Sequence, residues 1–415
     1  MDFLEIAKNA KEASLQLANL PTELKNSALE SIAKALEQNR QVLFDANKQD
    51  LKDAQKMVED GELSQAVFNR LKLDENKMNS MISGVKDLIN LEDPINKCLL
   101  ARELDAGLNL YKISCPIGVL GIIFEARPDV ITQISALAIK SANAVILKGG
   151  KEAINTNKAT FEIITKALNE VNGFPKNAIN QVFSHDDVAR MLDMNDYIDL
   201  IIPRGGNSLV KFIKSNTKIP VLGHADGICH ILIDETADLE MATNIVIDSK
   251  TQYPSACNAV ETLLIHKNFK FTEELLNNIK NAEIKLVDKP ERWDFEYSDK
   301  ILAYKFIENI NEAITHINKY GSGHTDAIVT DNIINAEKFL NEVDSAGVFH
   351  NSSTRFSDGY RYGFGAEVGI STNKTHARGP VGLEGLTIYK YKMYGSGQIV
   401  KDYAEGKKHF THKAI

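Results

Sequence analysis

The sequence has few cysteines and no long apolar run, and both absences restrict what the protein can be. Its 415 residues include four cysteines, Cys98, Cys115, Cys229 and Cys257, with no CxxC spacing, so neither a disulfide framework nor a zinc ribbon is expected. No apolar stretch approaches the ~18–20 residues of a membrane-spanning helix. The first residues carry acids instead of the basic segment of a secretory signal. We therefore expect a cytoplasmic protein in a reducing environment, with no membrane partner.

Several functional signatures are missing as well. The formal net charge is −8, which argues against nonspecific binding of nucleic acid. His224 and His230 do not form a metal-ligand spacing and no HExxH occurs, so we assign no metal. No serine lies in a G-x-S-x-G elbow, which disfavours a serine hydrolase. No G-x-G-x-x-G follows the first predicted strand, so the common dinucleotide fingerprint is also absent.

What the sequence does contain is an alternation of helices and strands. The N-terminal region has apolar residues at three- and four-residue spacing, as in Leu29, Ile32 and Leu36, and this spacing predicts helices. Residues 98–113 are typical of a hairpin with its turn at 105–107. Short apolar runs then alternate with helical stretches, and this order predicts parallel, doubly wound sheets.

Two sets of such units follow one another, so the predicted fold class is α/β, with two doubly wound α/β domains in tandem. The first set has predicted strands at 119–124, 144–147, 178–183 and 198–202, and predicted helices at 131–141, 152–171 and 186–194. The second has predicted strands at 230–233, 262–265, 327–330 and 347–350, and predicted helices at 238–250, 271–282 and 332–342. A last strand is predicted at 386–391.

Cys257 is the first candidate for chemistry. It lies among small residues, after a helical stretch and before an apolar strand, where a substrate could approach it. A thiolate is a competent nucleophile, and the charges around it decide how readily it forms. The alternative is a buried structural cysteine. That interpretation is kept for Cys98, Cys115 and Cys229, which lie in apolar runs.

The segment Arg204-Gly205-Gly206 is a glycine-rich corner between a predicted strand and a predicted helix. Free backbone N–H groups and the helix dipole at such a corner favour an anion. A plain turn is the alternative.

Two further corners of the first domain carry basic side chains. Lys148-Gly149-Gly150-Lys151 follows one predicted strand, and Arg127 follows another. Ligands of open α/β sheets collect at the carboxyl ends of strands, where these residues are expected. Ammonium and guanidinium groups there could hold a phosphate or a carboxylate. Solvated surface charges and structural ion pairs are the alternatives.

Six segments in this order resemble the aldehyde dehydrogenase superfamily, and most closely its branch that reduces gamma-glutamyl phosphate. They are 116–121 with 124–128, 145–150, 203–206, 221–227, 253–258 and 363–371. The resemblance implies a cofactor-binding domain, a catalytic domain and a small oligomerisation arm. The cofactor-binding domain is assigned to 1–97 and 114–226, with 361–382 as a candidate return to it, the catalytic domain to 227–360, and the arm to 98–113 and 383–415.

The resemblance also implies roles for individual residues. The expected catalytic residues are Cys257 as nucleophile, Asn258 and Arg127. The expected cofactor-binding residues are Lys148 on the adenosine ribose, Gly149, Gly150, Lys151, Arg204, Gly205 and Gly206. The expected substrate-binding residues are Arg127, His224, Asn351 and Glu367, with Glu125 and Ser352 as further candidates for the amino and carboxylate ends of the substrate.

Three positions distinguish between activities within this superfamily. Oxidising members carry a glutamate that activates water, and Val221 matches that position, so hydrolysis of an acyl-enzyme should be poor. Arg127 matches an asparagine that binds the oxyanion in those members, and it suits a phosphorylated substrate; the backbone N–H of Cys257 is the expected first oxyanion donor. Lys151 stands where NAD-preferring members often carry a carboxylate, and a cation there favours the 2′-phosphate of NADPH.

The expected function is therefore the NADPH-dependent reduction of gamma-glutamyl phosphate to glutamate 5-semialdehyde and phosphate through a thioester on Cys257, the second step of proline biosynthesis. Glutamate 5-kinase, which makes this acyl phosphate, is a candidate partner, and a homo-oligomer is expected. An NAD(P)-dependent aldehyde oxidiser, a CoA-dependent acyl reductase and a non-catalytic relative are the alternatives.

Overall fold

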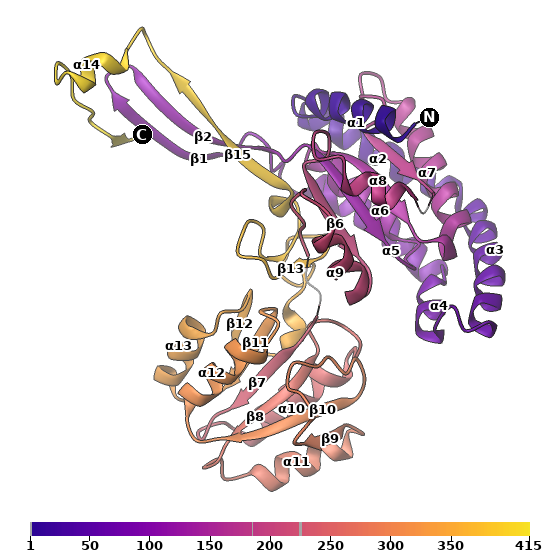
Figure 1. Ribbon diagram of the computed structural model, residues 1–415, viewed down its shortest axis with the longest axis vertical. Coiled ribbons are helices and arrows are strands. Elements are labelled where there is room, and N and C mark those ends of the chain that lie inside the picture. The colour runs from indigo at the N-terminus through magenta and orange to yellow at the C-terminus, as the bar shows by residue number, and fades with distance from the viewer. Residues whose placement is uncertain (1, 185, 224–225) are drawn as a thin grey trace. The chain divides into compact units, whose positions relative to one another are not determined.

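The computed structural model describes residues 2–184, 186–223 and 226–415 (Figure 1). The chain divides into two compact units. Unit 1 comprises Met1–Gly205, Ser215–Val221 and Gly382–Ile415, and unit 2 comprises Gly206–Lys214 and Leu222–Val381. Each unit contains a parallel sheet of its own. The assignment of cofactor binding, catalysis and oligomerisation to parts of the chain stays a prediction.

Unit 1 begins with five helices, as the apolar spacing of the N-terminal region predicts. In the second of them, Leu29, Ile32 and Leu36 recur on one face and are completely buried. The helices are α1 (Phe3–Leu17), α2 (Thr22–Gln38), α3 (Arg40–Glu59), α4 (Gln65–Leu71) and α5 (Glu75–Asn90). Among the described residues, no helix is both long and apolar enough to cross a membrane.

The parallel sheet of unit 1 has the strand order β5-β4-β3-β6, which reverses direction between β3 and β6. β3 (Val119–Phe124) is buried along its whole length, which explains its unbroken apolar sequence. Gly149 and Arg204 both pair in register with Phe124, so the carboxyl ends of three strands meet at one edge. The other elements, close to their predicted ranges, are β4 (Ala144–Gly149), β5 (Ile179–Val182), β6 (Leu200–Arg204), α6 (Val130–Lys140), α7 (Ile154–Asn169) and α8 (Asp186–Leu192).

A second, antiparallel sheet within unit 1 is the predicted arm, with strand order β15-β2-β1-β16. The hairpin is confirmed, and Gly107 takes a φ of 70° in its turn, a conformation that favours glycine. The predicted last strand is also confirmed and pairs along β2. The strands are β1 (Cys98–Asp105), β2 (Leu108–Pro116), β15 (Thr387–Tyr394) and β16 (Lys413–Ala414).

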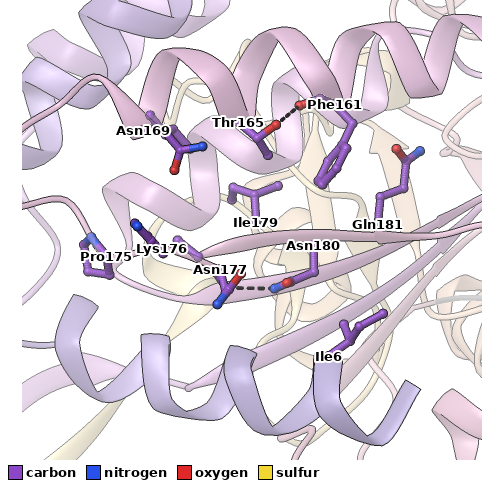
Figure 2. A pocket seen from close by; sticks show the side chains of 12 residues that line it. Ile6, Phe161, Thr165, Asn169, Pro175, Lys176, Asn177, Ile179, Asn180 and Gln181 are labelled. Carbon is purple, nitrogen blue, oxygen red and sulfur yellow. Dashed lines mark hydrogen bonds between the residues drawn. The ribbon is translucent and has the colours of Figure 1, made fainter. Parts of the chain in front are cut away.

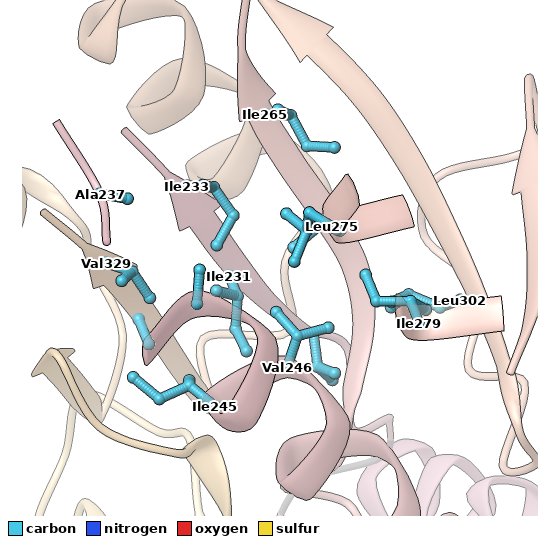
Figure 3. Packing of buried hydrophobic residues seen from close by; sticks show 14 of the residues in the cluster. Ile231, Ile233, Ala237, Ile245, Val246, Ile265, Leu275, Ile279, Leu302 and Val329 are labelled. Carbon is cyan, nitrogen blue, oxygen red and sulfur yellow. The ribbon is translucent and has the colours of Figure 1, made fainter. Parts of the chain in front are cut away.

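Unit 2 is built on a six-stranded parallel sheet with the order β12-β11-β7-β8-β10-β9. Figure 3 shows side chains of β7, including Ile231 and Ile233, packed with Val246 of α10 and Leu275 of α11. Leu232 belongs to a separate buried cluster on the sheet, so β7 is covered on both faces, which explains the apolar sequence of Ile231–Ile233. The predicted elements here are confirmed as β7 (Cys229–Ile233), α10 (Leu239–Thr251), β8 (Val260–His266), α11 (Thr272–Asn281), β11 (Thr325–Val329), α13 (Ile333–Glu342) and β12 (Gly347–His350).

Of the described elements of unit 2 that were not predicted from the sequence, three are longer than three residues. They are β9 (Lys285–Asp288), β10 (Ile301–Ile307) and α12 (Ile310–Tyr320). β9 is short and forms the edge of the sheet, and β10 carries Lys305 within its apolar sequence. Neither strand therefore shows the unbroken apolar run by which the central strands were found.

Candidate active site

Cys257 lies in unit 2, in the loop between α10 and β8, and is partly exposed. A Cβ at Gly227 would collide with the backbone of Cys257, so glycine is required for this close approach. The thiol of Cys229 donates to the carbonyl oxygen of Cys257 over 3.4 Å. Because Cys257 precedes β8 and Cys229 opens the neighbouring β7, these contacts place Cys257 at the amino ends of the parallel strands.

The ring of His324 contacts the sulfur of Cys257. Its Nε2 lies 3.2 Å from Sγ, and its Nδ1 lies 2.8 Å from Oγ1 of Thr325. His324 and Thr325 are both completely buried, and His324 immediately precedes β11. The sequence analysis did not select His324, because no motif or short spacing connects it with Cys257.

Arg355 is a second group near Cys257 that the sequence analysis missed. It lies in the 3-10 turn η2 (Thr354–Phe356), is 8% exposed, and donates from Nε to Oε1 of Gln252 over 2.9 Å. Burial lowers the pKa of Arg355 and the charge of Arg361 adds to this effect, while the charge of the Cys257 thiolate opposes it. The guanidinium of Arg355 and the sulfur of Cys257 are therefore close enough to interact electrostatically.

Asn258, which was predicted to be catalytic, follows Cys257 in the chain and is buried. Its Nδ2 donates to the carbonyl oxygen of Ser357 over 2.8 Å, and its own carbonyl oxygen accepts from Oγ1 of Thr354 over 2.7 Å. Within the described residues its Oδ1 is buried and has no hydrogen-bond partner. A buried acceptor in this state is suited to a donor from a ligand or a water molecule.

A buried ion pair joins the two elements that flank the Cys257 loop. Nζ of Lys250, near the end of α10, lies 2.7 Å from Oε2 of Glu261 in β8, and both side chains are almost completely buried. Burial raises the pKa of Glu261 to about 7, although the charge of Lys250 opposes this shift. Burial also lowers the pKa of Lys250. The pair therefore contributes both to the fold of the loop and to its response to pH.

In unit 1, the predicted ligand residues lie at the carboxyl edge of the sheet, where the strand order reverses. Arg127 is exposed in the loop after β3. In the same loop the N–H of Ala126 donates to Oε1 of Glu152 over 2.6 Å, which ties the corner after β3 to the corner after β4. Such a reversal point is where ligands of open α/β sheets bind.

The two lysines of the corner after β4 differ in their surroundings. Lys148 is 9% exposed, its Nζ donates to the carbonyl oxygen of Gly149 over 2.7 Å, and burial lowers its pKa. Lys151 is largely exposed and pairs with Glu62 over 3.1 Å. Gly150 separates the end of β4 from the short helix that Lys151 begins. A buried and an exposed cation thus follow the same strand.

The third corner, Arg204-Gly205-Gly206, joins β6 to α9 (Asn207–Ser215), as predicted. The carbonyl oxygen of Arg204 accepts from the N–H of Glu125 over 3.0 Å, which connects this corner to the loop after β3. The structure therefore brings Arg127 and the predicted cofactor residues that follow β4 and β6, as far as Gly205, to one edge of the unit 1 sheet. It places Gly206, Cys257 and Asn258 in unit 2. Their roles stay predictions.

The remaining substrate candidates have structural contacts. Oδ1 of Asn351 accepts from the N–H of Thr330 over 2.9 Å, and Nδ2 of Asn351 donates to the carbonyl oxygen of Thr330 over 3.0 Å. Glu367 accepts from the N–H of Gly359 over 2.8 Å. These contacts give both residues a role in holding the backbone, and substrate binding by either stays a prediction. His224 lies outside the described residues.

A cavity of about 680 Å³ lies elsewhere in unit 1, between α1, α7 and β5 (Figure 2). Its lining includes Phe161, Asn180 and Gln181, and none of the predicted site residues. The cavity is therefore separate from the carboxyl-edge corners. In the described part of the chain, no group of three or more His, Cys, Asp or Glu side chains is arranged to hold a metal ion.

Comparison with known proteins identifies the family. The model of the aldehyde dehydrogenase family matches residues 1–295. The chain is 58% identical to the gamma-glutamyl phosphate reductase of Brachyspira hyodysenteriae, with 100% of both chains covered, and 52% identical to that of Acetivibrio thermocellus, with 100% and 99% covered.

Solved structures agree with this assignment. The crystal structure of gamma-glutamyl phosphate reductase from Thermotoga maritima superimposes with a TM-score of 0.92 at 37% identity, over 96% of this chain and 100% of that one. An acetylating aldehyde dehydrogenase from Geobacillus thermoglucosidasius, 17% identical with a TM-score of 0.69, shares the fold over 96% of this chain and 97% of its own. The predicted aldehyde dehydrogenase-like α/β fold is confirmed, and the chain belongs to the aldehyde dehydrogenase family and, within it, to the gamma-glutamyl phosphate reductases.

Proposed function

We propose that the chain catalyses the NADPH-dependent reduction of gamma-glutamyl phosphate to glutamate 5-semialdehyde and inorganic phosphate, through a thioester on Cys257. In this role it performs the second step of proline biosynthesis. The observation that carries the proposal is the partly exposed Cys257 thiol beside His324 and Arg355, in a chain that matches gamma-glutamyl phosphate reductases over its full length.

The chemistry needs a nucleophile, a leaving group and a hydride. The Cys257 sulfur attacks the acyl carbon, the bond from that carbon to the phosphate oxygen breaks, and a thioester forms. NADPH supplies a hydride to the thioester carbon. The carbon–sulfur bond then breaks, so that the aldehyde leaves and the thiolate returns. Arg355 supports this scheme because a guanidinium is well suited to a phosphate or carboxylate group of the substrate.

Reduction, and not hydrolysis, is favoured by the residue at position 221. A water molecule needs a general base to attack a thioester efficiently, and Val221 has no group that could accept a proton. Phosphate is already the leaving group of an acyl phosphate, so the reductive route needs no base that activates water. The same argument disfavours an enzyme that oxidises aldehydes with water.

The carboxyl edge of unit 1 suits a dinucleotide. Lys148 and Lys151 supply a buried and an exposed cation after β4. Gly149 and Gly150 lie between them, where a Cβ would collide with the side chains of Asn157 and Glu152. The contact between Lys151 and Glu62 is exposed, so a 2′-phosphate could replace the carboxylate at little cost. This is the basis for NADPH as the preferred cofactor.

The arm is proposed as a surface for self-association. Several of its large apolar side chains are exposed, including Tyr391 at 60%, Met393 at 57% and Tyr394 at 61%. Exposed apolar groups concentrated on one sheet are typical of an interface. The supply of an unstable acyl phosphate by glutamate 5-kinase belongs to the same proposal, as does a cytoplasmic location, which the four unpaired cysteines suit.

The reverse reaction tests the function. Glutamate 5-semialdehyde and NADP+ are incubated with the enzyme, with and without inorganic phosphate, and NADPH is followed by its absorbance. The proposal predicts NADPH formation only when phosphate is present. Equal rates without phosphate would show that water accepts the acyl group, and the reaction class would be wrong. Replacement of phosphate by coenzyme A tests the CoA-dependent alternative, for which we expect no NADPH.

A further inference from the structure

We infer that His324 is the acid–base partner of Cys257, taking the thiol proton as the sulfur attacks and giving a proton to the leaving phosphate. The inference deepens the proposed function, because it names the group that activates the nucleophile of that reaction. It rests on contacts within unit 2 alone.

The side chains of Cys257, His324 and Thr325 lie in a row. Nε2 of His324 lies 3.2 Å from Sγ of Cys257, and Nδ1 lies 2.8 Å from the hydroxyl oxygen of Thr325. When Nδ1 carries the ring proton and donates it to Thr325, the lone pair of Nε2 faces the sulfur. A nucleophile, a base in contact with it and a third group that orients the base form the arrangement expected of an activated cysteine.

Backbone hydrogen bonds hold His324 in place. The N–H of Gly347 donates to the carbonyl oxygen of His324, and the N–H of Ala346 donates to that of Gly323, both over 2.9 Å. Gly323 takes a φ of 70°, which favours glycine and turns the chain into β11. A completely buried imidazole held on two sides has little freedom to leave the sulfur.

Cys229 and Arg355 are further titratable groups that interact with Cys257. Cys229 of β7 is buried, and burial raises its pKa well above the ordinary value, so it stays a neutral thiol. Arg355 of η2 carries a charge that stabilises the thiolate, but a guanidinium does not accept protons. Of these neighbours, the imidazole of His324 is the one with a nitrogen lone pair that can accept the thiol proton.

With His324 in this role, every proton that the reaction releases or consumes is accounted for. The thiol proton moves to Nε2 as the carbon–sulfur bond forms. His324 gives this proton to the phosphate oxygen as the carbon–oxygen bond breaks, so phosphate leaves as the hydrogen phosphate ion. After the hydride has been delivered and the aldehyde has left, the thiolate recovers one proton from solvent through His324. One proton is consumed for each aldehyde formed, which is the stoichiometry of the reduction.

Alkylation of Cys257 by iodoacetamide tests the inference without substrate or cofactor. The rate is measured by peptide-resolved mass spectrometry from about pH 6 to about pH 10 in the wild type and in His324→Asn. We expect His324→Asn to react about tenfold more slowly near pH 7, and the two rates to converge toward pH 10, where the thiol ionises without assistance. A profile that is unchanged, or lowered by the same factor at every pH, overturns the inference.

Two further variants control for the fold. Thr325→Val removes the acceptor of the Nδ1 proton and keeps the shape, and a smaller shift of the alkylation profile in the same direction is expected, even if His324→Asn fails to fold. His350→Gln removes a ring that bonds the carbonyl oxygen of Thr330 instead of Cys257, and its profile should match the wild type. Since alkylation requires no turnover, a failure here is distinguishable from a failure of the phosphate-dependent reverse reaction.

Discussion

The two parallel sheets of this protein present their chemically interesting residues at opposite ends of their strands. In unit 1 the basic and glycine-rich corners follow β3, β4 and β6, at the carboxyl ends. In unit 2 Cys257 precedes β8 and His324 precedes β11, at the amino ends. Both sheets are doubly wound, so strand order alone does not decide which end carries the site.

At the carboxyl end of the unit 2 sheet, where a ligand would usually bind, polar side chains form hydrogen bonds within the protein. Asp234, which follows β7, accepts from Oγ1 of Thr330 over 2.7 Å and from Nδ2 of Asn335 over 2.9 Å. The side chain of Asn351 bonds the backbone of Thr330. Polar groups that satisfy one another in this way stabilise the end of the sheet and leave little for a ligand to bind. The predicted ligand residues of unit 1 therefore follow the rule that ligands collect at carboxyl ends, and the predicted nucleophile of unit 2 departs from it.

The largest expected effect comes from removing the nucleophile at the amino end. Cys257→Ala should lower the rate of the phosphate-dependent reverse reaction by at least about 10³-fold, because no thioester can form. Binding of NADP+, followed by fluorescence titration, should be retained. Cys98→Ala is the matched control and should keep the wild-type rate. Cys98 was expected to be a buried structural cysteine, but that expectation is wrong, because it is exposed on a strand of the arm. Substantial turnover by Cys257→Ala would show that Cys257 of unit 2 is not the nucleophile.

The next effect concerns stability, at the ion pair that flanks the Cys257 loop. Lys250→Met leaves Glu261 buried without its partner, and we expect a loss of about 3–5 kcal/mol in the free energy of unfolding near pH 8. Urea denaturation measures this loss. Lys338→Met is the control, because its pair with Glu342 is partly exposed on one helix and should contribute less than about 1 kcal/mol.

The pH dependence of the same variant follows from the pKa of Glu261. Burial raises this pKa from 4.5 to about 7 in the folded wild type, so the fold favours the protonated carboxyl. The stability that this group contributes is present below its ordinary value of 4.5 and is lost as the pH rises through about 7. In Lys250→Met the carboxyl can take a proton near pH 5 and avoid an unpaired charge, so the penalty should be smaller there than near pH 8. Equal penalties at the two pH values would contradict this account.

Arginines of the two units can be compared directly as substrate ligands. Arg355→Lys keeps the charge but removes the planar, two-pronged donor beside Cys257, and we expect the KM for glutamate 5-semialdehyde to rise about 10- to 100-fold. Arg127→Lys makes the same change in unit 1, where the side chain is exposed. A larger rise for Arg127→Lys than for Arg355→Lys would show that unit 1 supplies the main anion contact.

The sequence predicted those parts of the molecule whose signals are local. β3 and the segment Ile231–Ile233 of β7 are covered on both faces and appear as unbroken apolar runs, and the hairpin of the arm has a glycine in its turn. Edge strand β9 and the lysine-containing β10 have no such pattern, and their existence depends on a sheet that is already formed.

The candidate site was likewise predicted only where its residues have a local signal in the sequence. Cys257 was found because small residues surround it in sequence and a family motif contains it, and the cationic corners because they follow apolar strands. His324 and Arg355 reach Cys257 only through the parallel pairing of β7, β8 and β11 and through the turn after β12. Contacts between residues so far apart in the chain leave no trace in a single sequence.

The smallest expected effect tests the carboxyl end of unit 1. Lys151→Glu replaces an exposed cation after β4 by an anion that repels a 2′-phosphate, and we expect the ratio of kcat/KM for NADPH over NADH to fall about tenfold. Lys158→Glu makes the same change of charge on the exposed face of α7, seven positions further along the chain, and should leave the ratio unchanged. Because the effect depends on an exposed charge, it should shrink as salt is added. An effect of equal size in both variants would mean that the general charge of the surface, and not the corner after β4, selects the cofactor.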